Sequence, residues 1–353
     1  MSPATMRVGD RLIGAGAPVF VIAEAGVNHN GDLELARKLV AAAAAAGADA
    51  VKFQTFRTEA LVARTAPKAA YQVETTGGGE SQLEMLRKLE LGPAAHATLR
   101  DESAKRGILF FSSPFDEASA DALEALGVAL FKVPSGEITN LPFLRHLAGK
   151  RRPLIVSTGM STLDEVAEAV TAIREAGDPP IALLHCLSSY PAPVEETNLR
   201  AMDTLSARFG CPVGLSDHTT GIDIAIAAVA RGATIVEKHV TLDKALPGPD
   251  HRASLDPEEL ASLLGAIRRV EAALGDGDKR PQPSEADTRR VARKSLVAAR
   301  PIRAGERLTR DLIAIKRPGT GISPAELDRA LGRVVVRALA GDDVIDWAAL
   351  GDA

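Results

Sequence analysis

Between residue 19 and about residue 275, short apolar runs alternate with longer stretches of helical pattern. The apolar runs predict strands at 19–24, 50–54, 108–112, 130–133, 154–157, 181–185, 213–216 and 235–238. Strands that are hydrophobic nearly throughout and alternate with helices are typical of a parallel sheet covered by helices. Eight evenly spaced units favour a closed (β/α)8 TIM barrel over an open, doubly wound sheet. No G-x-G-x-x-G follows the first strand, which disfavours a dinucleotide-binding fold.

Helices are expected between these strands, at 33–46, 94–106, 117–126, 163–175, 222–230 and 257–274. A glycine follows most of them, as a helix stop signal requires. A barrel of this type takes about 250 residues, so the chain of 353 residues has room for a second module. The stretch 275–287 (GDGDKRPQPSEAD) is polar and has the composition of a linker. We expect a barrel domain at 1–278, a linker at 279–290 and a small, β-rich domain at 291–353.

Composition narrows the range of partners. Hydrophobic residues make up 46% and charged residues 25%, as in ordinary soluble proteins, and a net charge of -4 gives no argument for nucleic acid or anionic membrane. The first ten residues lack the apolar core of a signal peptide, and the alanine-rich run 40–47 is too short to span a bilayer. Cys186 and Cys211 are expected to be reduced thiols. We therefore expect a cytoplasmic protein that binds neither nucleic acid nor membrane.

Polar residues interrupt the expected strands at their carboxyl ends. They include Glu24, Lys52, Gln54, Ser112, Ser113, Lys132, Ser135, Ser157, His185, Ser188, Tyr190, Ser216, His218, Glu237 and His239. A single polar residue in such a place is more often a solvated loop residue. Solvated loop residues do not readily explain why eight consecutive strands all end in polar residues. A TIM barrel builds its active site from several strands at this face. The pattern therefore predicts an enzyme active site. His96 and His146, in helical stretches, are expected on the surface.

His218 and His239 end adjacent strands and lack the cysteine partners of a structural zinc site. Two imidazoles, with waters or with a carboxylate such as Glu24, leave open positions on a divalent ion, and mixed nitrogen and oxygen ligation suits manganese or magnesium. Spacing alone leaves the alternative open that His218 is a loop hydrogen-bond donor and His239 a strand-end histidine with no ligand.

Lys52 and Lys132 place positive charge inside an apolar barrel mouth, which requires carboxylates or an anionic ligand nearby. The hydroxyls of Ser113, Ser135 and Ser216 are suitable donors to phosphate or carboxylate oxygens. One lysine could instead form a Schiff base, as in aldolases built on this barrel. Composition does not separate anion binding from Schiff-base chemistry.

Nine segments, in order along the chain, resemble the N-acetylneuraminate synthase family. They are IAEAGVNHNG (22–31), VKFQTF (51–56), SSPFD (112–116), FKVPSGEITN (131–140), STGM (157–160), LHCLSSYPAP (184–193), GLSDHT (214–219), VEKHVTLD (236–243) and PGPDHRASL (247–255). That family includes synthases of sialic, legionaminic and pseudaminic acids and a spore-coat polysaccharide relative. The tail 294–322 resembles the antifreeze-like (SAF) domain attached to these enzymes.

The resemblance implies a role for each matching residue. His218 and His239 match the ligands of a divalent ion, usually Mn²⁺, with Mg²⁺ or Co²⁺ as alternatives. The positions that hold phosphoenolpyruvate are matched by Lys52, Lys132, Ser113, Ser135 and Ser216. Those around the sugar and the reacting aldehyde are matched by Glu24, Gln54, Tyr190 and Asp250. Arg317 matches an arginine that reaches the sugar's acylamino group from the SAF domain of the partner subunit, which implies a domain-swapped homodimer.

Ser188 stands where many sialic acid synthases carry an asparagine that helps to hold phosphoenolpyruvate. Glu24 is our candidate for the general acid or base. The implied reaction is the metal-dependent condensation of phosphoenolpyruvate with an N-acyl amino hexose, either N-acetylmannosamine or a related diacetamido sugar. It yields a nonulosonic acid and releases phosphate. The alternatives are a Schiff-base pyruvate aldolase and a catalytically silent sugar-binding relative.

Overall fold

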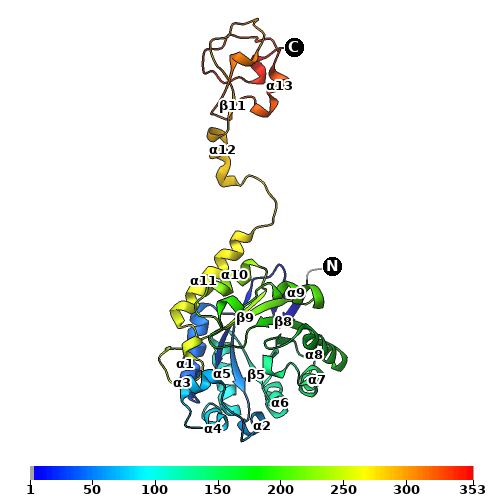
Figure 1. Ribbon diagram of the computed structural model, residues 1–353, viewed down its shortest axis with the longest axis vertical. Coiled ribbons are helices and arrows are strands. Elements are labelled where there is room, and N and C mark those ends of the chain that lie inside the picture. The colour runs from blue at the N-terminus through cyan, green and yellow to red at the C-terminus, as the bar shows by residue number, and fades with distance from the viewer. Residues whose placement is uncertain (1–3, 353) are drawn as a thin grey trace. The chain divides into compact units, whose positions relative to one another are not determined.

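The computed structural model describes residues 4–352. The chain divides into two compact units, residues 1–275 and 276–353. Figure 1 shows the first unit as strands surrounded by helices and the second as a small unit with little helix.

The first unit is a parallel barrel. Its strands are β3 (Phe20–Gly26), β4 (Ala50–Thr55), β5 (Leu109–Pro114), β6 (Phe131–Val133), β7 (Leu154–Ser157), β8 (Ile181–Cys186), β9 (Val213–Asp217) and β10 (Ile235–His239). They pair in the order β5-β4-β3-β10-β9-β8-β7-β6, and β5 and β6 lie against each other and bring the sheet round on itself. Each expected strand is present, with its ends displaced by two residues at most. The predicted TIM barrel is confirmed.

Eight helices follow the strands around the outside of the barrel: α1 (Leu33–Ala46), α5 (Pro93–Lys105), α6 (Glu117–Leu126), α7 (Leu141–Gly149), α8 (Leu163–Ala176), α9 (Ala201–Phe209), α10 (Asp223–Ala230) and α11 (Pro257–Leu274). Their starts follow from local chemistry, since Asp32, Asp116, Thr162 and Asp256 accept hydrogen bonds from the first free backbone N–H groups. The sequence pattern did not predict α7 and α9. Both are nine residues long, and α7 contains a proline and a glycine, which weaken the helical signal.

The barrel interior is closed at its amino end by an antiparallel hairpin, β1 (Thr5–Val8) and β2 (Arg11–Gly14), which the sequence pattern also did not predict. Met6, Val8 and Ile13 of this hairpin pack against inward-facing strand residues such as Phe111 and Ile155. A second apolar layer lies between the strands and the helices. The amino end is thus filled with hydrophobic side chains, and the polar strand ends lie at the opposite end of the barrel.

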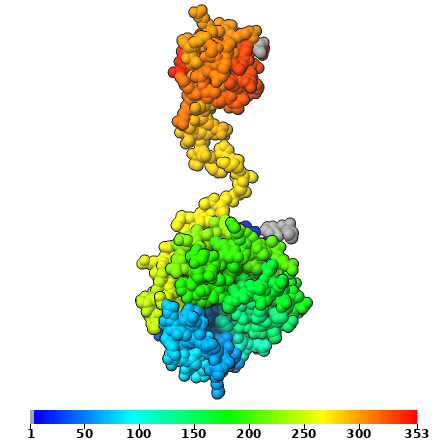
Figure 2. Space-filling model, viewed as in Figure 1, coloured from blue at the N-terminus to red at the C-terminus, as the bar shows by residue number. Residues whose placement is uncertain are grey.

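The connection between β4 and α5 is much longer than the other loops of the barrel. This connection, residues 56–92, is called the β4–α5 segment below and contains α2 (Thr58–Leu61), α3 (Ala70–Thr76) and α4 (Gln82–Arg87). In Figure 1 these three short helices lie together beside the barrel, and Figure 2 shows their blue and cyan surface next to the green surface of the central part of the chain.

The second unit begins with α12 (Ala286–Ala292), which occupies part of the stretch expected to be a linker. An antiparallel pair follows, β11 (Ser295–Ala298) and β12 (Ile313–Lys316), with the short helix α13 (Leu327–Ala330). Val334 and Val335 form isolated bridges, with Arg307 and with Leu350 respectively. The unit has a hydrophobic core of its own. No helix within residues 4–352 has both the length and the apolar character needed to cross a membrane.

Candidate active site

A cavity of about 530 Å³ opens at the carboxyl ends of the barrel strands. Twelve residues expected at the site line it: Glu24, Lys52, Gln54, Ser113, Lys132, Ser135, Ser188, Tyr190, Ser216, His218, His239 and Asp250. The thirteenth, Arg317, is exposed and belongs to the second unit, just after β12. The barrel therefore brings together residues that are up to 226 positions apart in the sequence, counted from Glu24 to Asp250 (250 − 24).

Successive residues of a strand point to opposite faces, and this decides which strand-end residues reach the cavity. On β9 and β10, Ser216, His218, Glu237 and His239 line the cavity, whereas Asp217 and Lys238 point away from it. Asp217 and Lys238 instead pair with each other at 2.8 Å, and both side chains are 0% exposed.

Two further hydrophilic strand-end residues, Ser112 and His185, do not line the cavity either. Ser112 hydrogen-bonds the hydroxyl of Thr55 at 2.7 Å, and the ring of His185 donates from Nε2 to the carbonyl of Thr197 at 2.6 Å. The expectation that His96 is a surface residue is wrong, because it is 3% exposed and its Nε2 lies 2.8 Å from the Thr55 hydroxyl. His146 is half-buried and lies 2.8 Å from Asp121.

Two lysines and two glutamates form a buried cluster at the base of the cavity. Lys52 lies 2.8 Å from Glu24 and 3.7 Å from Glu237, and Lys132 lies 3.3 Å from Glu237. All four side chains are at most 5% exposed. Both lysines therefore have the carboxylate partners that burial of a charge requires.

The pKa values of the four groups in this cluster are shifted in different directions. Burial alone would raise the pKa of Glu237, but Lys132 and Lys52 outweigh it and lower that pKa to about 2. Burial raises the pKa of Glu24 in spite of the nearby Lys52. For Lys132, burial lowers the pKa, whereas for Lys52 the two glutamates overcome burial and raise it. Glu237 is thus the permanent anion of the cluster, and Glu24 is its carboxyl group best able to hold a proton.

Hydroxyl groups surround the two lysines. Lys52 donates to Ser113 at 3.1 Å and Lys132 donates to Ser157 at 2.7 Å. The backbone N–H of Gly159 donates to the Ser135 hydroxyl at 3.0 Å. A Cβ atom at position 159 would come within 2.3 Å of the Ser188 hydroxyl, so only glycine lets this turn approach the pocket. Ammonium and hydroxyl donors that converge in this way suit the oxygens of a phosphate or a carboxylate.

His218 and His239 face each other beside this cluster, with ring centroids 5.4 Å apart. His218 donates from Nδ1 to the Leu187 carbonyl at 2.7 Å, which leaves its Nε2 as the nitrogen with a free lone pair. His239 Nδ1 is buried without a hydrogen-bond partner, and an Asp250 carboxylate oxygen lies 3.9 Å from it. Burial, and then the proximity of His218, lower the pKa of His239 well below its ordinary value, so this ring is neutral at pH 7.

Within residues 4–352 there is no cluster of three or more histidine, cysteine or acidic side chains spaced to hold a metal ion. Two imidazoles alone would leave the other positions of a divalent ion open, as in a catalytic rather than a closed structural metal site.

The far side of the cavity is aromatic and acidic. The Tyr190 ring lies over His218, with centroids 4.2 Å apart, and Tyr71 lies over Tyr190 at 5.1 Å. Gln54 belongs instead beside the lysine–glutamate cluster, because it donates to Glu24 at 3.4 Å. Burial raises the pKa of Asp250 to about 6.

Four of the polar residues that line the cavity were given no role from the sequence: Tyr71, Gln72, Gln82 and Glu237. Glu237 was noted as a strand-end residue, and two lysines at the ends of other strands signal the need for a counter-charge. Tyr71, Gln72 and Gln82 belong to the β4–α5 segment. The unusual length of this loop at the active face was the signal that could have marked it.

The sequence and the structure were compared with known proteins. The NeuB family matches residues 39–279, and the SAF domain matches residues 293–351. The chain is 46% identical to an N,N'-diacetyllegionaminic acid synthase of Legionella pneumophila, over 95% of each chain. It is 48% identical to an enzyme of the same name from Campylobacter jejuni, over 92% of this chain and 98% of that one.

A crystal structure of an N-acetylneuraminic acid synthetase from Leptospira borgpetersenii, in complex with citrate, superposes with a TM-score of 0.72 at 36% identity. The match covers 81% of this chain and 95% of that one. The family matches and the sequence identities extend over both units. The chain is therefore an enzyme of the NeuB family with a C-terminal SAF domain.

Proposed function

We propose that this enzyme condenses phosphoenolpyruvate with an N-acyl amino hexose to form a nonulosonic acid, with release of phosphate. One observation carries the proposal: a buried, hydroxyl-lined pair of lysines and a pair of facing histidines share a single cavity. The lysines suit an anionic substrate, and the histidines suit a divalent ion that activates a carbonyl.

Phosphoenolpyruvate matches the lysine end of the cavity because it carries a phosphate and a carboxylate on neighbouring carbons. Lys52 and Lys132 would neutralise these groups, and Ser113 and Ser135 would donate hydrogen bonds to their oxygens. The Ser216 hydroxyl donates to Glu237 at 2.9 Å and would have to turn from it to join them. Ser188 is placed to join them, since its hydroxyl is next to the turn at Gly159. Because these donors are already held in place, little reorganisation is needed when charge shifts in the reaction.

A divalent ion, most suitably Mn²⁺ and alternatively Mg²⁺ or Co²⁺, would be held by His218 and His239. The residues fit such an ion, because the buried Nδ1 of His239 has no hydrogen-bond partner and the ring is neutral. When bound, the ion supplies Lewis-acid polarisation of the sugar aldehyde.

The reaction balances as follows. Carbon 3 of phosphoenolpyruvate forms a bond to the aldehyde carbon, and the aldehyde oxygen takes up a proton. Water adds to carbon 2 and gives up one proton, which replaces the one that the aldehyde oxygen has taken up. The carbon–oxygen bond to phosphate then breaks, the second proton of the water leaves with the phosphate, and the keto acid remains. Glu24 is our candidate for the proton donor, because burial raises its pKa and its Oε2 has no hydrogen-bond partner. Glu237, which stays ionised, would stabilise positive charge that develops at carbon 2.

The sugar would occupy the cavity beside Gln54, Tyr190 and Asp250. Both relatives named above are synthases of N,N'-diacetyllegionaminic acid, and the superposed structure is a sialic acid synthetase. N-Acetylmannosamine and a diacetamido hexose are therefore the two candidate sugars.

We also propose that Arg317 contacts the acylamino group from the SAF domain of a second subunit, in a domain-swapped homodimer. Cys186 and Cys211 are free cysteines, which fits a reducing compartment such as the cytoplasm.

One observation favours a second candidate: burial lowers the pKa of Lys132, as in lysines that form Schiff bases. Phosphate release from phosphoenolpyruvate with each acylamino sugar, in the presence of Mn²⁺, separates the two. Release that requires the sugar and stops on chelation supports the synthase. Borohydride trapping of pyruvate on the protein, without phosphate release, would instead indicate a Schiff-base aldolase. Sugar binding without either reaction would indicate a silent relative.

A further inference from the structure

Three buried polar residues lie behind the two histidines that face the cavity. They are Asp217, Thr219 and Lys238, each at most 2% exposed, and they are called the strand-end lock below. None of them lines the cavity, so their role is not contact with a ligand there. Asp217 and Thr219 flank His218 in the sequence, and Lys238 directly precedes His239.

Lys238 bonds to both residues that flank His218. Its ammonium group donates to one carboxylate oxygen of Asp217 at 2.8 Å and to the backbone carbonyl of Thr219 at 2.5 Å. The other carboxylate oxygen of Asp217 accepts from the backbone N–H of Thr219 at 2.9 Å and from its hydroxyl at 2.8 Å. The chain on both sides of His218 is thus tied to the residue next to His239.

Backbone pairing between β9 and β10 stops before His218. The register of these strands ends at Asp217 opposite Lys238, whereas His239 is paired with Glu24 of β3. The hydrogen bonds of the strand-end lock extend the connection between β9 and β10 past this last pair. They therefore hold the two imidazoles in a set relation, with ring centroids 5.4 Å apart.

A buried ion pair is a poor means of stabilising a strand end. Apolar residues of similar volume are often at least as stable in such places, because two buried charges lose their hydration. The charged groups supply direction instead, since their hydrogen bonds form only at short distances and in particular orientations. Replacing groups that orient metal ligands in this way commonly reduces metal affinity by about tenfold to a hundredfold.

We propose that the strand-end lock positions His218 and His239 for the divalent ion, so that Asp217 and Lys238 are positioning residues of the metal site. This inference rests on the proposed binding of that ion by the two histidines. Lys238 would act through geometry and not through its charge. A lone cation beside the site would repel the ion, but Asp217 neutralises that cation at 2.8 Å.

Titration calorimetry of Mn²⁺ into the full-length chain compares wild type with Asp217→Asn, Lys238→Met and the double variant. Loss of position predicts weaker binding in all three, by about tenfold or more. The double variant should bind no more weakly than the weaker single variant, because all three break the same connection. An effect of charge alone predicts opposite signs, with weaker binding in Asp217→Asn, tighter binding in Lys238→Met and wild-type binding in the double variant.

The electron paramagnetic resonance spectrum of bound Mn²⁺ gives a second readout, because it depends on the arrangement of the ligands. It should differ from the wild-type spectrum in the double variant. If a single variant does not fold, the double variant still decides between position and charge, since it leaves no buried charge without a partner.

Leu147→Ala is the matched control for a general loss of stability. Leu147 is 0% exposed on α7, which follows β6, and β7 and β8 separate β6 from β9 in the sheet. The cavity left by this substitution should destabilise the barrel. Its affinity for Mn²⁺ should nevertheless equal that of wild type, because the strand-end lock is intact.

The outcomes separate this inference from the metal site on which it rests. Wild-type Mn²⁺ affinity in the double variant, or tighter binding by Lys238→Met, would overturn the inference and leave the metal site intact. An equal loss of affinity in Leu147→Ala would also overturn it, because the strand-end lock would then act only through stability. Absence of Mn²⁺ binding by wild type, or wild-type affinity in His239→Ala, would overturn the proposed metal site, and the inference with it.

Discussion

The buried pair of Asp217 and Lys238 allows a quantitative prediction. The two side chains are 2.8 Å apart and 0% exposed, on the face of β9 and β10 that points away from the cavity. Lys238 also donates to the Thr219 carbonyl at 2.5 Å, and Asp217 accepts from the Thr219 N–H at 2.9 Å. The pair thus fixes the strand ends that carry His218 and His239.

Asp217→Asn leaves an acceptor for the Thr219 N–H but removes the counter-charge of Lys238. Breaking a buried ion pair from one side costs about 3–5 kcal/mol, because the remaining charge has no partner. For a domain of this size each 1 kcal/mol lowers the Tm by about 2–4 °C, so we expect a decrease of about 6–20 °C. The double variant Asp217→Asn/Lys238→Met removes the orphaned charge as well, and should be more stable than the sum of the two single variants predicts by about 2 kcal/mol or more.

These differences are measured by urea and thermal unfolding, followed by circular dichroism, of wild type, Asp217→Asn, Lys238→Met and the double variant. Glu34→Gln is the matched control, because it removes an exposed ion pair with Arg37 on α1 and should change stability by less than about 1 kcal/mol. A loss below about 1 kcal/mol for Asp217→Asn, or a double-mutant coupling near zero, would refute the view that this pair stabilises the barrel by charge neutralisation.

Two further predictions concern the site, and a third concerns the buried His29. His239→Ala should abolish phosphate release and weaken Mn²⁺ binding, as measured by titration calorimetry. If the variant binds Mn²⁺ as tightly as wild type does, His239 is not a metal ligand. Arg317→Ala should raise the KM for the sugar at least about tenfold more than the KM for phosphoenolpyruvate, and equal increases would contradict a contact with the acylamino group. Burial lowers the pKa of His29 to about 4 from its ordinary 6.5. As the pH falls, His29 is therefore protonated in the unfolded chain before it is protonated in the folded chain. The free energy of unfolding should decrease by about 3 kcal/mol between pH 6.5 and pH 4. Urea unfolding at both pH values should show a smaller loss for His29→Asn, and an identical loss would rule out His29 as the cause.

The barrel strands were predictable because hydrophobic runs between helices have few other stable arrangements. Leu154–Ser157 and Leu33–Ala46 were predicted at the bounds that the structure shows. The hairpin β1–β2 was not, since four-residue strands give a weak periodic signal and Met6 and Ile13 gain their burial only from the barrel interior. The same holds for His96, whose burial depends on Thr55, a residue 41 positions away in the sequence.

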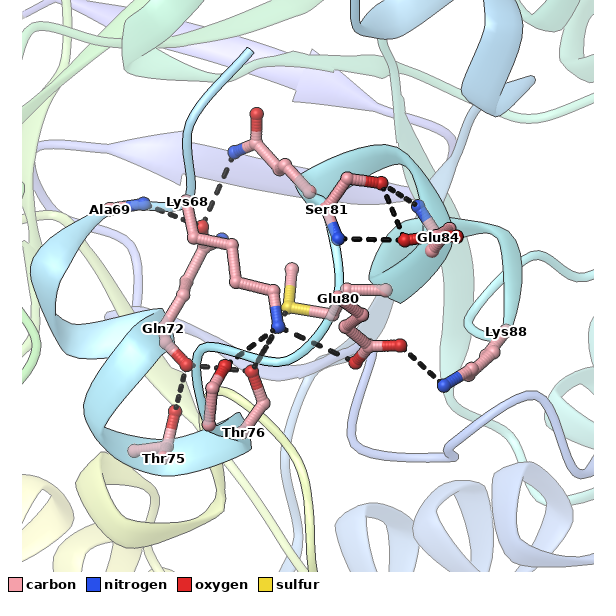
Figure 3. Close-up of polar contacts among 12 residues, drawn as sticks. Lys68, Ala69, Gln72, Thr75, Thr76, Glu80, Ser81, Glu84 and Lys88 are labelled. Atoms are coloured by element: carbon pink, nitrogen blue, oxygen red, sulfur yellow. Dashed lines mark hydrogen bonds and ion pairs between the residues drawn. The ribbon is translucent and has the colours of Figure 1, made fainter. Parts of the chain in front are cut away.

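By itself the sequence determined the order of strands and helices, and with it the end of the barrel where polar residues collect. Only the tertiary structure decided which of those residues reach the cavity, because the pleat and register of a closed sheet turn alternate side chains inward. That is why Ser113 faces the cavity while Ser112 does not, and why Glu237 joins the lysines while Lys238 pairs with Asp217 behind them. Gln72 likewise reaches the cavity only because the long β4–α5 segment, held by the buried Lys68, folds beside the barrel mouth (Figure 3).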